Sequence, residues 1–249
     1  MKTELKQAEI LFIGAHPDDV ELGCGGTIIK AVEKGHNVAI VDMTAGEMGT
    51  RGSGEIRLKE SAEAAKILGV SFRHCMHLPD TKLKVCDEFE RAAVDILRII
   101  RPRIIFTPYP AATHPDHVAA SEIFASAWYK AGFGKYESPL PRFRPARVIN
   151  YYLGQSDNPS FVVDISAQID KRRAAIACYA SQFFNTEAKE QKLPETRLSS
   201  PGFSDALEVK LRYFGQRILK TFGEPFFMNQ LPEIEDPAAL TDPNWIFKE

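Results

Sequence analysis

Short apolar runs alternate with helical patterns along most of the chain, and this alternation restricts the fold more than any other feature. The runs are rich in β-branched and aromatic residues, which favour strands. They cover residues 9–15, 38–44, 71–78 (the weakest), 103–109, 148–153 and 161–165. Helical patterns cover 20–34, 55–68, 88–101, 115–130, 174–183 and 205–222. This order predicts a Rossmann-like three-layer α/β/α fold with a mostly parallel sheet.

Two proline-containing motifs lie directly after predicted strands. His16-Pro17-Asp18-Asp19 follows the first strand, and His114-Pro115-Asp116-His117 follows the run at 103–109. Proline is tolerated in the first turn of a helix and pushes the preceding residue toward extended backbone. Each motif therefore predicts a strand, a sharp corner and a helix start. Because ligands of parallel sheets bind beyond the carboxyl ends of the strands, both motifs are expected at one cleft.

The residue types in these motifs suit a catalytic metal centre. Two imidazoles and a carboxylate can hold zinc and leave a fourth position open for water, and the same donors suit iron(II). A further carboxylate and imidazole remain for proton transfer. Taken singly, either motif is more often a helix cap, because Asp accepts hydrogen bonds from the first helical amides. Two motifs at equivalent strand ends favour a metal, since clustered ionisable groups are costly without one.

A dinucleotide site at the first corner is an alternative. A strand, a glycine-containing turn, a helix and Asp42 at the end of the next strand are features of such sites. However, His16 and Asp19 occupy the positions that need glycine, and carboxylates at this helix start would repel a pyrophosphate. The sequence therefore disfavours a nucleotide. The remaining histidines, His36, His74 and His77, are not assigned to the metal.

Composition and charge exclude several classes of function. The 249 residues are 44% hydrophobic and contain no linker rich in Ser, Gly or Pro, which predicts a single domain over 1–249. A net charge of -2 with interspersed signs argues against nucleic acid as a partner. Residues 1–15 lack the apolar length of a signal peptide or membrane span, so a cytoplasmic protein without a membrane partner is expected. The 4 cysteines form no CxxC pair and predict neither disulfides nor a thiolate zinc site.

The residues around both motifs resemble a known family. Residues 15–21, followed by Gly25-Gly26-Thr27 and the downstream motif at 114–117, are similar to the PIG-L/LmbE family of zinc-dependent N-acetylglucosamine deacetylases. The resemblance implies an LmbE-like fold. Further stretches resemble the branch that acts in bacillithiol biosynthesis, namely 44–47 with Arg51, 55–57, 64–70, 78–80, Arg144-Pro145, 179–183 and 213–226.

This resemblance implies a role for each motif residue. His16, Asp19 and His117 would bind the metal, and Asp18 would act as general base, while either Asp18 or His114 would protonate the departing amine. A protonated His114 would face the developing oxyanion, with Asp116 orienting it. Some relatives have a tyrosine at the position of Ala112, and Tyr109 lies nearby here.

Substrate contacts are also implied by similarity. The polar residues that would contact sugar hydroxyls and an acidic aglycone are Glu47, Arg51, Arg57, Asp80 and Arg144. The alternative is that these side chains form surface ion pairs. The loop 45–55 contains four glycines and is expected to act as a lid at the same sheet edge.

The implied function is hydrolysis of the acetamide of an N-acetylglucosaminide, with N-acetylglucosaminyl-malate as the favoured substrate. The alternatives are deacetylation of another N-acetylglucosamine derivative and a non-catalytic metal- or sugar-binding module. Asp18 counts against the module, because a binding site has no need of an unligated carboxylate beside the metal. Relatives form hexamers, so a homo-oligomer is expected by analogy.

Overall fold

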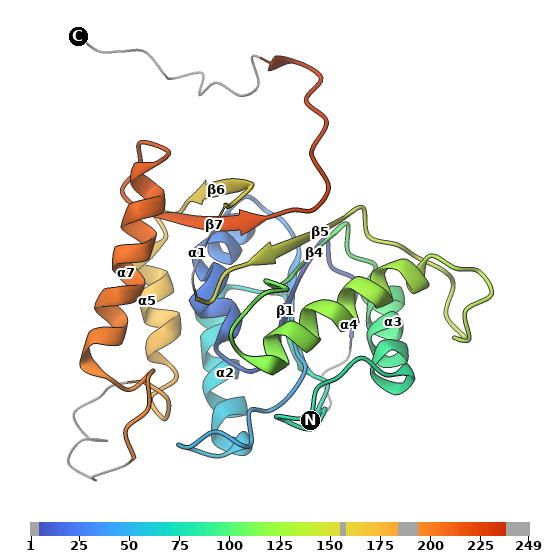
Figure 1. Cartoon of the computed structure of the whole chain (residues 1–249), viewed down its shortest axis with the longest axis horizontal. Coiled ribbons are helices and arrows are strands. Elements are labelled where there is room, and N and C mark those ends of the chain that lie inside the picture. Colours follow the sequence, from blue (N-terminus) through green and yellow to red (C-terminus); the bar gives the residue numbers. More distant parts are fainter. Residues whose placement is uncertain (1–4, 155–157, 184–193, 238–249) are drawn as a thin grey trace.

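A sheet of seven strands forms the centre of the computed structural model, which describes residues 5–154, 158–183 and 194–237. The strands are β1 (Ile10–Gly14), β2 (Val38–Asp42), β3 (Phe72–Cys75), β4 (Ile104–Pro108), β5 (Arg147–Tyr151), β6 (Phe161–Asp164) and β7 (Gly223–Phe227). Their order is β3-β2-β1-β4-β5-β7-β6 (Figure 1). The first five are parallel, and β7 runs antiparallel to β5 and β6.

Helices cover both faces of the sheet (Figure 1). One face carries α3 (Asp87–Ile100) and α4 (Pro115–Ala131), and the other carries α1 (Asp19–Glu33), α2 (Gly54–Leu68), α5 (Ile169–Ala177) and α7 (Pro201–Gln216). The alternation of side chains along β1 explains the two cores. Leu11 and Ile13 pack under α3 and α4, whereas Phe12 points to the other face and stacks on Phe106 at 4.4 Å between ring centroids.

A buried carboxylate from β7 supports a break in α1. The backbone of Cys24 has a non-helical φ of -154°, and the helix restarts after it. Glu224 accepts hydrogen bonds from the amides of Gly26 at 2.9 Å and Thr27 at 2.7 Å, and from Nε of Arg172 at 3.1 Å. Glu224 therefore caps the second part of α1 and neutralises a buried arginine, which ties β7 and α5 to this helix.

The predicted fold class is confirmed, and the differences lie in the C-terminal third. Strand β7 was not predicted because Gly223 and Pro225 disfavour strands, but it pairs with two neighbours. Helix α5 spans Ile169–Ala177 rather than the expected 174–183. It ends at Ala177 because the following chain turns and places Tyr179 and Phe183 in the core. Helix α7 spans 201–216 rather than 205–222.

The domain prediction extends past the described part of the chain. Residues 1–4, 155–157, 184–193 and 238–249 lie outside the described residues, so a single domain over 1–249 stays a prediction. Among the described residues, none of the helices combines the length and apolar character that a membrane crossing requires.

Candidate active site

The two proline-containing motifs meet because β1 and β4 are neighbours at the point where the strand order reverses. At the first corner, α1 begins at Asp19, and Asp18 precedes it with a φ of 102°. This backbone conformation is rare for a residue with a side chain, and such strain is concentrated at functional sites. The Asp19 carboxylate closes the corner by accepting a hydrogen bond from the amide of His16 at 2.9 Å. Pro17 lies before the helix rather than in its first turn.

The second corner has the expected geometry. Pro115 opens α4, and His114 before it is extended, with φ -82° and ψ 127°. One helical turn brings the rings of His114 and His117 to 4.8 Å between centroids. The ring of His16 lies 4.9 Å from that of His114 and 5.4 Å from that of His117. Three imidazoles from two chain segments therefore converge at one edge of the sheet.

Asp19 lies between two of these imidazoles. Its Oδ1 is 3.1 Å from Nε2 of His117, and its Oδ2 is 3.6 Å from Nδ1 of His16. Burial alone would raise the pKa of Asp19, but the two imidazoles hold it well below the usual value. Two donors at about 2.1 Å from a tetrahedral zinc lie about 3.4 Å apart, which is the spacing of these atoms. Each of these two contacts, one to each carboxylate oxygen of Asp19, therefore has about the spacing of a pair of zinc ligands.

The other nitrogen of His16 faces two carboxylates. Its Nε2 is 3.1 Å from Oδ1 of Asp80 and 3.2 Å from Oδ2 of Asp116. These carboxylates are fixed by backbone amides, of Met48 for Asp80 and of Thr81 for Asp116, each at 2.8 Å. Burial opposes the charge on His16, but the hydrogen bonds to Asp116, Asp19 and Asp80 raise its pKa well above the usual value. A proton on Nε2 leaves Nδ1 as the metal-binding atom.

Two sets of ligand atoms lie within 4.8 Å of one another and so close enough for one metal, namely His16 with His114 and His117, and His16 with Asp80 and Asp116. The surroundings favour a metal bound to Nδ1 of His16, on the side of Asp19 and His117. His16, Asp19 and His117 line a cavity together with Asp18 and His114, whereas Asp116 is 2% exposed and is not part of the cavity wall. A metal on the Nδ1 side is accessible to a substrate, and a metal held by Asp116 is shielded from it.

Asp18 is buried beside the predicted ligands. Its Oδ2 accepts a hydrogen bond from Nη2 of Arg57 at 3.1 Å, and Arg57 also donates to the carbonyls of Gly46 and Pro17. Burial raises the pKa of Asp18 to about 7, with Arg57 opposing the shift. A carboxylate with this pKa can take and return a proton near neutral pH, as a general base must.

The imidazole of His114 is engaged by the backbone on one side. Its Nδ1 accepts a hydrogen bond from the backbone amide of Asp116 at 3.2 Å, so the proton of the neutral ring lies on Nε2. Burial lowers the pKa of His114, and the nearby His16 and His117 lower it further. Nε2 is therefore the ring atom that can donate into the cavity, and the protonated form of His114 stays a prediction. The predicted pairing is wrong, because the Asp116 carboxylate is directed at His16 and its backbone amide contacts His114.

The five predicted substrate residues divide into two groups. Asp80 and Arg57 lie in the cavity wall, and Glu47 is next to them because it accepts a hydrogen bond from the amide of Asp80 at 2.8 Å. Arg51 is 6% exposed and does not line the cavity. Arg144 is not brought to the site. Its guanidinium stacks on Tyr129 at 4.6 Å and donates to the Tyr129 carbonyl at 2.7 Å, near the end of α4.

The cavity has a volume of about 330 Å³, at the lower end of the range for small-molecule sites. Its wall includes residues that the sequence analysis missed, namely Met48, Thr81, Thr113, Gln182, Arg197, Leu198 and Phe203. Gln182 lay in a stretch noted only for family likeness, and Arg197 follows no periodic pattern. Ala112 is in the wall, while Tyr109 stacks on Tyr152 at 4.5 Å and is not. Of the predicted lid, Met48 and Gly49 reach the cavity.

Comparison with known proteins identifies the family. The model of the PIG-L family, described as GlcNAc-PI de-N-acetylase, matches residues 11–128. Diacetylchitobiose deacetylase from Thermococcus kodakarensis is 31% identical over 188 residues, which cover 70% of each chain. The chain belongs to the PIG-L family. This confirms the predicted family, and the family supports deacetylation of N-acetylglucosamine-type substrates.

Two further relatives extend this result. A probable N-acetyl-alpha-D-glucosaminyl L-malate deacetylase 2 from Bacillus anthracis is 27% identical over 74% of this chain and 87% of its own. The crystal structure of the conserved protein TT1542 from Thermus thermophilus has a TM-score of 0.83 and 38% identity, covering 93% of this chain and 98% of that one. The fold of this PIG-L family member is therefore shared over nearly its whole length.

Proposed function

We propose that this protein is a metal-dependent N-deacetylase that hydrolyses the acetamide of an N-acetylglucosaminide, with N-acetylglucosaminyl-malate as the favoured substrate. The observation that carries the proposal is Asp18. It is a buried carboxylate with a pKa raised to about 7, and it adjoins the Asp19 and His16 pair without being part of it. A module that only binds sugar or metal has no use for such a group.

His16, Asp19 and His117 would hold the metal. A bound zinc or iron(II) ion would polarise the amide carbonyl and lower the pKa of a water molecule. Zinc is the expected ion by family likeness, and these donors also suit iron(II). Asp80 and Asp116 would keep the proton of His16 on Nε2 and so direct Nδ1 to the metal.

Asp18 would act on the protons of the reaction. It takes a proton from the attacking water, and Arg57 keeps its carboxylate in place. The same proton then passes to the amine nitrogen as the bond to the acetyl carbon breaks, so that acetate and a free amine leave. His114 has its Nδ1 engaged by a backbone amide, so its Nε2–H would donate to the oxygen of the tetrahedral intermediate.

The malate deacetylase among the relatives and the stretches that resemble the bacillithiol branch support an acidic aglycone. A second candidate substrate is a neutral chitooligosaccharide, which the likeness to diacetylchitobiose deacetylase favours. We further propose, by family analogy, that the protein forms a hexamer, and we propose a cytoplasmic location from its sequence.

An acetate-release assay tests the function. Metal-loaded protein is offered N-acetylglucosaminyl-malate, diacetylchitobiose and free N-acetylglucosamine, with and without a chelator. We expect chelator-sensitive release that is fastest with the malyl glycoside. Faster release from diacetylchitobiose would favour the second candidate, and no release from any of them would refute the deacetylase assignment.

A further inference from the structure

Charge is unevenly distributed around the cavity. The end where the two motifs meet contains the carboxylates of Asp18, Asp19 and Asp80. Among the lining residues that the structure describes, Arg57 and Arg197 carry the permanent positive charges. Arg57 is 5% exposed, and its guanidinium is engaged by Asp18 and two backbone carbonyls. Its positive charge is therefore already paired with the Asp18 carboxylate.

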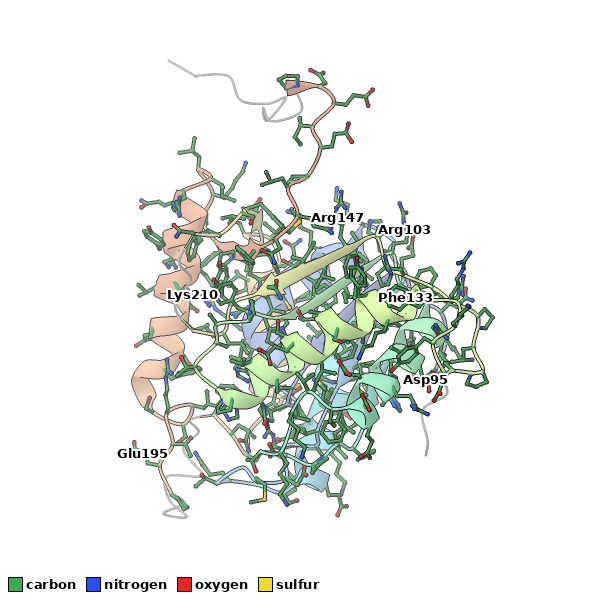
Figure 2. The ribbon with its side chains drawn as sticks, turned by 45° about the vertical axis from the view of Figure 1, so that its right-hand side comes forward. Asp95, Arg103, Phe133, Arg147, Glu195 and Lys210 are labelled. Atoms are coloured by element: carbon green, nitrogen blue, oxygen red, sulfur yellow. The ribbon has the colours of Figure 1, made fainter. Side chains whose placement is uncertain are left out.

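Arg197 is in a different situation. Its side chain is exposed, and no carboxylate of the described residues forms an ion pair with it. It lies in the turn that leads into α7. Figure 2 labels Glu195 in this turn and Lys210 further along the helix. Arg197 thus belongs to the cavity wall and has an exposed side chain, and it comes from an element that carries none of the predicted motif residues.

The backbone around Arg197 is held in place. The hydroxyl of Ser200 donates to the Arg197 carbonyl at 2.8 Å, and the hydroxyl of Ser199 accepts from the amide of Thr196 at 2.8 Å. Leu198 packs against the core under α1, and Ser199 is 4% exposed. A fixed backbone with an exposed side chain is a suitable arrangement for binding a charged group at the wall of a cavity.

We propose that Arg197 binds a carboxylate on the aglycone of the substrate while the acetamide lies at the two His-Pro motifs. This inference rests on the proposed deacetylase function and adds the residue that binds its acidic aglycone. The planar guanidinium can donate two parallel hydrogen bonds to a carboxylate. A carboxylate beside the two motifs would instead meet the negative charges of Asp18 and Asp80, so the charges favour one orientation of the glycoside.

The position of the other arginines supports this assignment. Arg51 lies outside the cavity wall and Arg144 stacks on the aromatic rings of α4, so neither reaches the cavity. The anion-binding role that the resemblance gave to Arg51, Arg57 or Arg144 is therefore assigned to Arg197.

The test compares two glycosides in four proteins. The substrates are N-acetylglucosaminyl-malate and methyl N-acetylglucosaminide, which lacks the carboxylate. The proteins are the wild type, Arg197→Ala, Arg197→Lys and the control Arg144→Ala, which removes an arginine distant from the cavity. We expect Arg197→Ala to lower kcat/KM on the malyl glycoside about 10- to 100-fold, mainly through KM. The loss on the methyl glycoside should be much smaller, Arg197→Lys should recover part of the activity on the malyl glycoside, and Arg144→Ala should match the wild type.

A binding measurement separates this inference from the proposed function. In the metal-loaded Asp18→Asn background, calorimetry gives the Kd of each glycoside with and without Arg197→Ala. A selective loss of affinity for the malyl glycoside would support the role of Arg197, whether or not acetate is released by the wild type. Absence of acetate release would refute only the deacetylase assignment. Equal losses on both glycosides, or no loss on either, would overturn the inference and leave the deacetylase assignment intact.

Discussion

Replacing Asp116 with Asn tests how the site prepares its metal ligand. Asp116 Oδ2 is 3.2 Å from Nε2 of His16 and accepts a hydrogen bond from the amide of Thr81 at 2.8 Å. Both contacts use Oδ2, so the single oxygen of the nearly isosteric Asn can accept from the same two partners, but without a charge it does so more weakly. The carboxylate that favours a proton on Nε2, and with it a free lone pair on Nδ1, is lost.

The structure sets the size of the effect. Removing a carboxylate that orients a metal-binding histidine costs about 10- to 100-fold in metal affinity. Asp80 still faces the same nitrogen at 3.1 Å, so Asp116→Asn alone should cost about tenfold, or about 1.4 kcal/mol. Asp80→Asn should cost a similar amount. The double variant leaves Nε2 without a carboxylate partner, and we expect about 100-fold.

The assay is the zinc Kd by competition with a chromophoric chelator, with circular dichroism as the control for folding. At saturating zinc, each single variant should still bind about one ion per chain. An unchanged Kd in the double variant would refute the orienting role. Complete loss of zinc in Asp116→Asn, with retention in His117→Ala, would place the metal between His16, Asp80 and Asp116 instead.

Three further predictions follow from buried charges. Metal-loaded Asp18→Asn should bind zinc like the wild type yet turn over at least about 100-fold more slowly, and near wild-type turnover would remove Asp18 from the mechanism. Because burial raises the pKa of Asp18 from 3.8 to about 7, the metal-free folded state binds its proton more tightly than the unfolded state, so this group destabilises the protein as pH rises through that interval. In urea unfolding of the metal-free proteins, the free energy of unfolding of Asp18→Asn should therefore rise relative to that of the wild type as pH rises from about 4 to about 7. The same difference in free energy at both pH values would contradict the raised pKa of Asp18. Glu224→Ala leaves Arg172 unpaired at 1% exposure and should cost about 3 to 5 kcal/mol in the free energy of unfolding, whereas a loss below about 1 kcal/mol would show that the buried pair contributes little.

The parts of the fold that the sequence predicted are those with local signals. β1, β2 and β4 have continuous apolar runs, and α2 to α4 end at Gly69, Arg101 before Pro102, and Gly132. β7 has no such signal, because its pairing depends on strands distant in sequence. Helix α5 begins in a charged segment without an apolar run, and its Arg172 is paired with Glu224, which is distant in sequence.

The candidate site also has a part that the sequence predicted and a part that depends on contacts between distant residues. The meeting of the two motifs followed from parallel-sheet topology, because β1 and β4 end at the same edge. The partners of Asp116 did not follow from the sequence, since its carboxylate turns toward His16, 100 residues away, rather than to His114. Arg197 lies in a turn without periodicity, and only the tertiary fold brings it to the cavity. Arg144 was expected at the substrate from family likeness, but its guanidinium is stacked on an aromatic ring outside the cavity, which the sequence alone does not show.

Titration of metal-depleted protein with zinc tests the central claim most directly. Acetate release from N-acetylglucosaminyl-malate is measured at each addition, together with the zinc bound. We predict that release is absent without metal, rises in proportion to bound zinc and reaches a plateau at about one ion per chain. Full release from metal-free protein, or no release from protein that has bound its ion, would contradict the account.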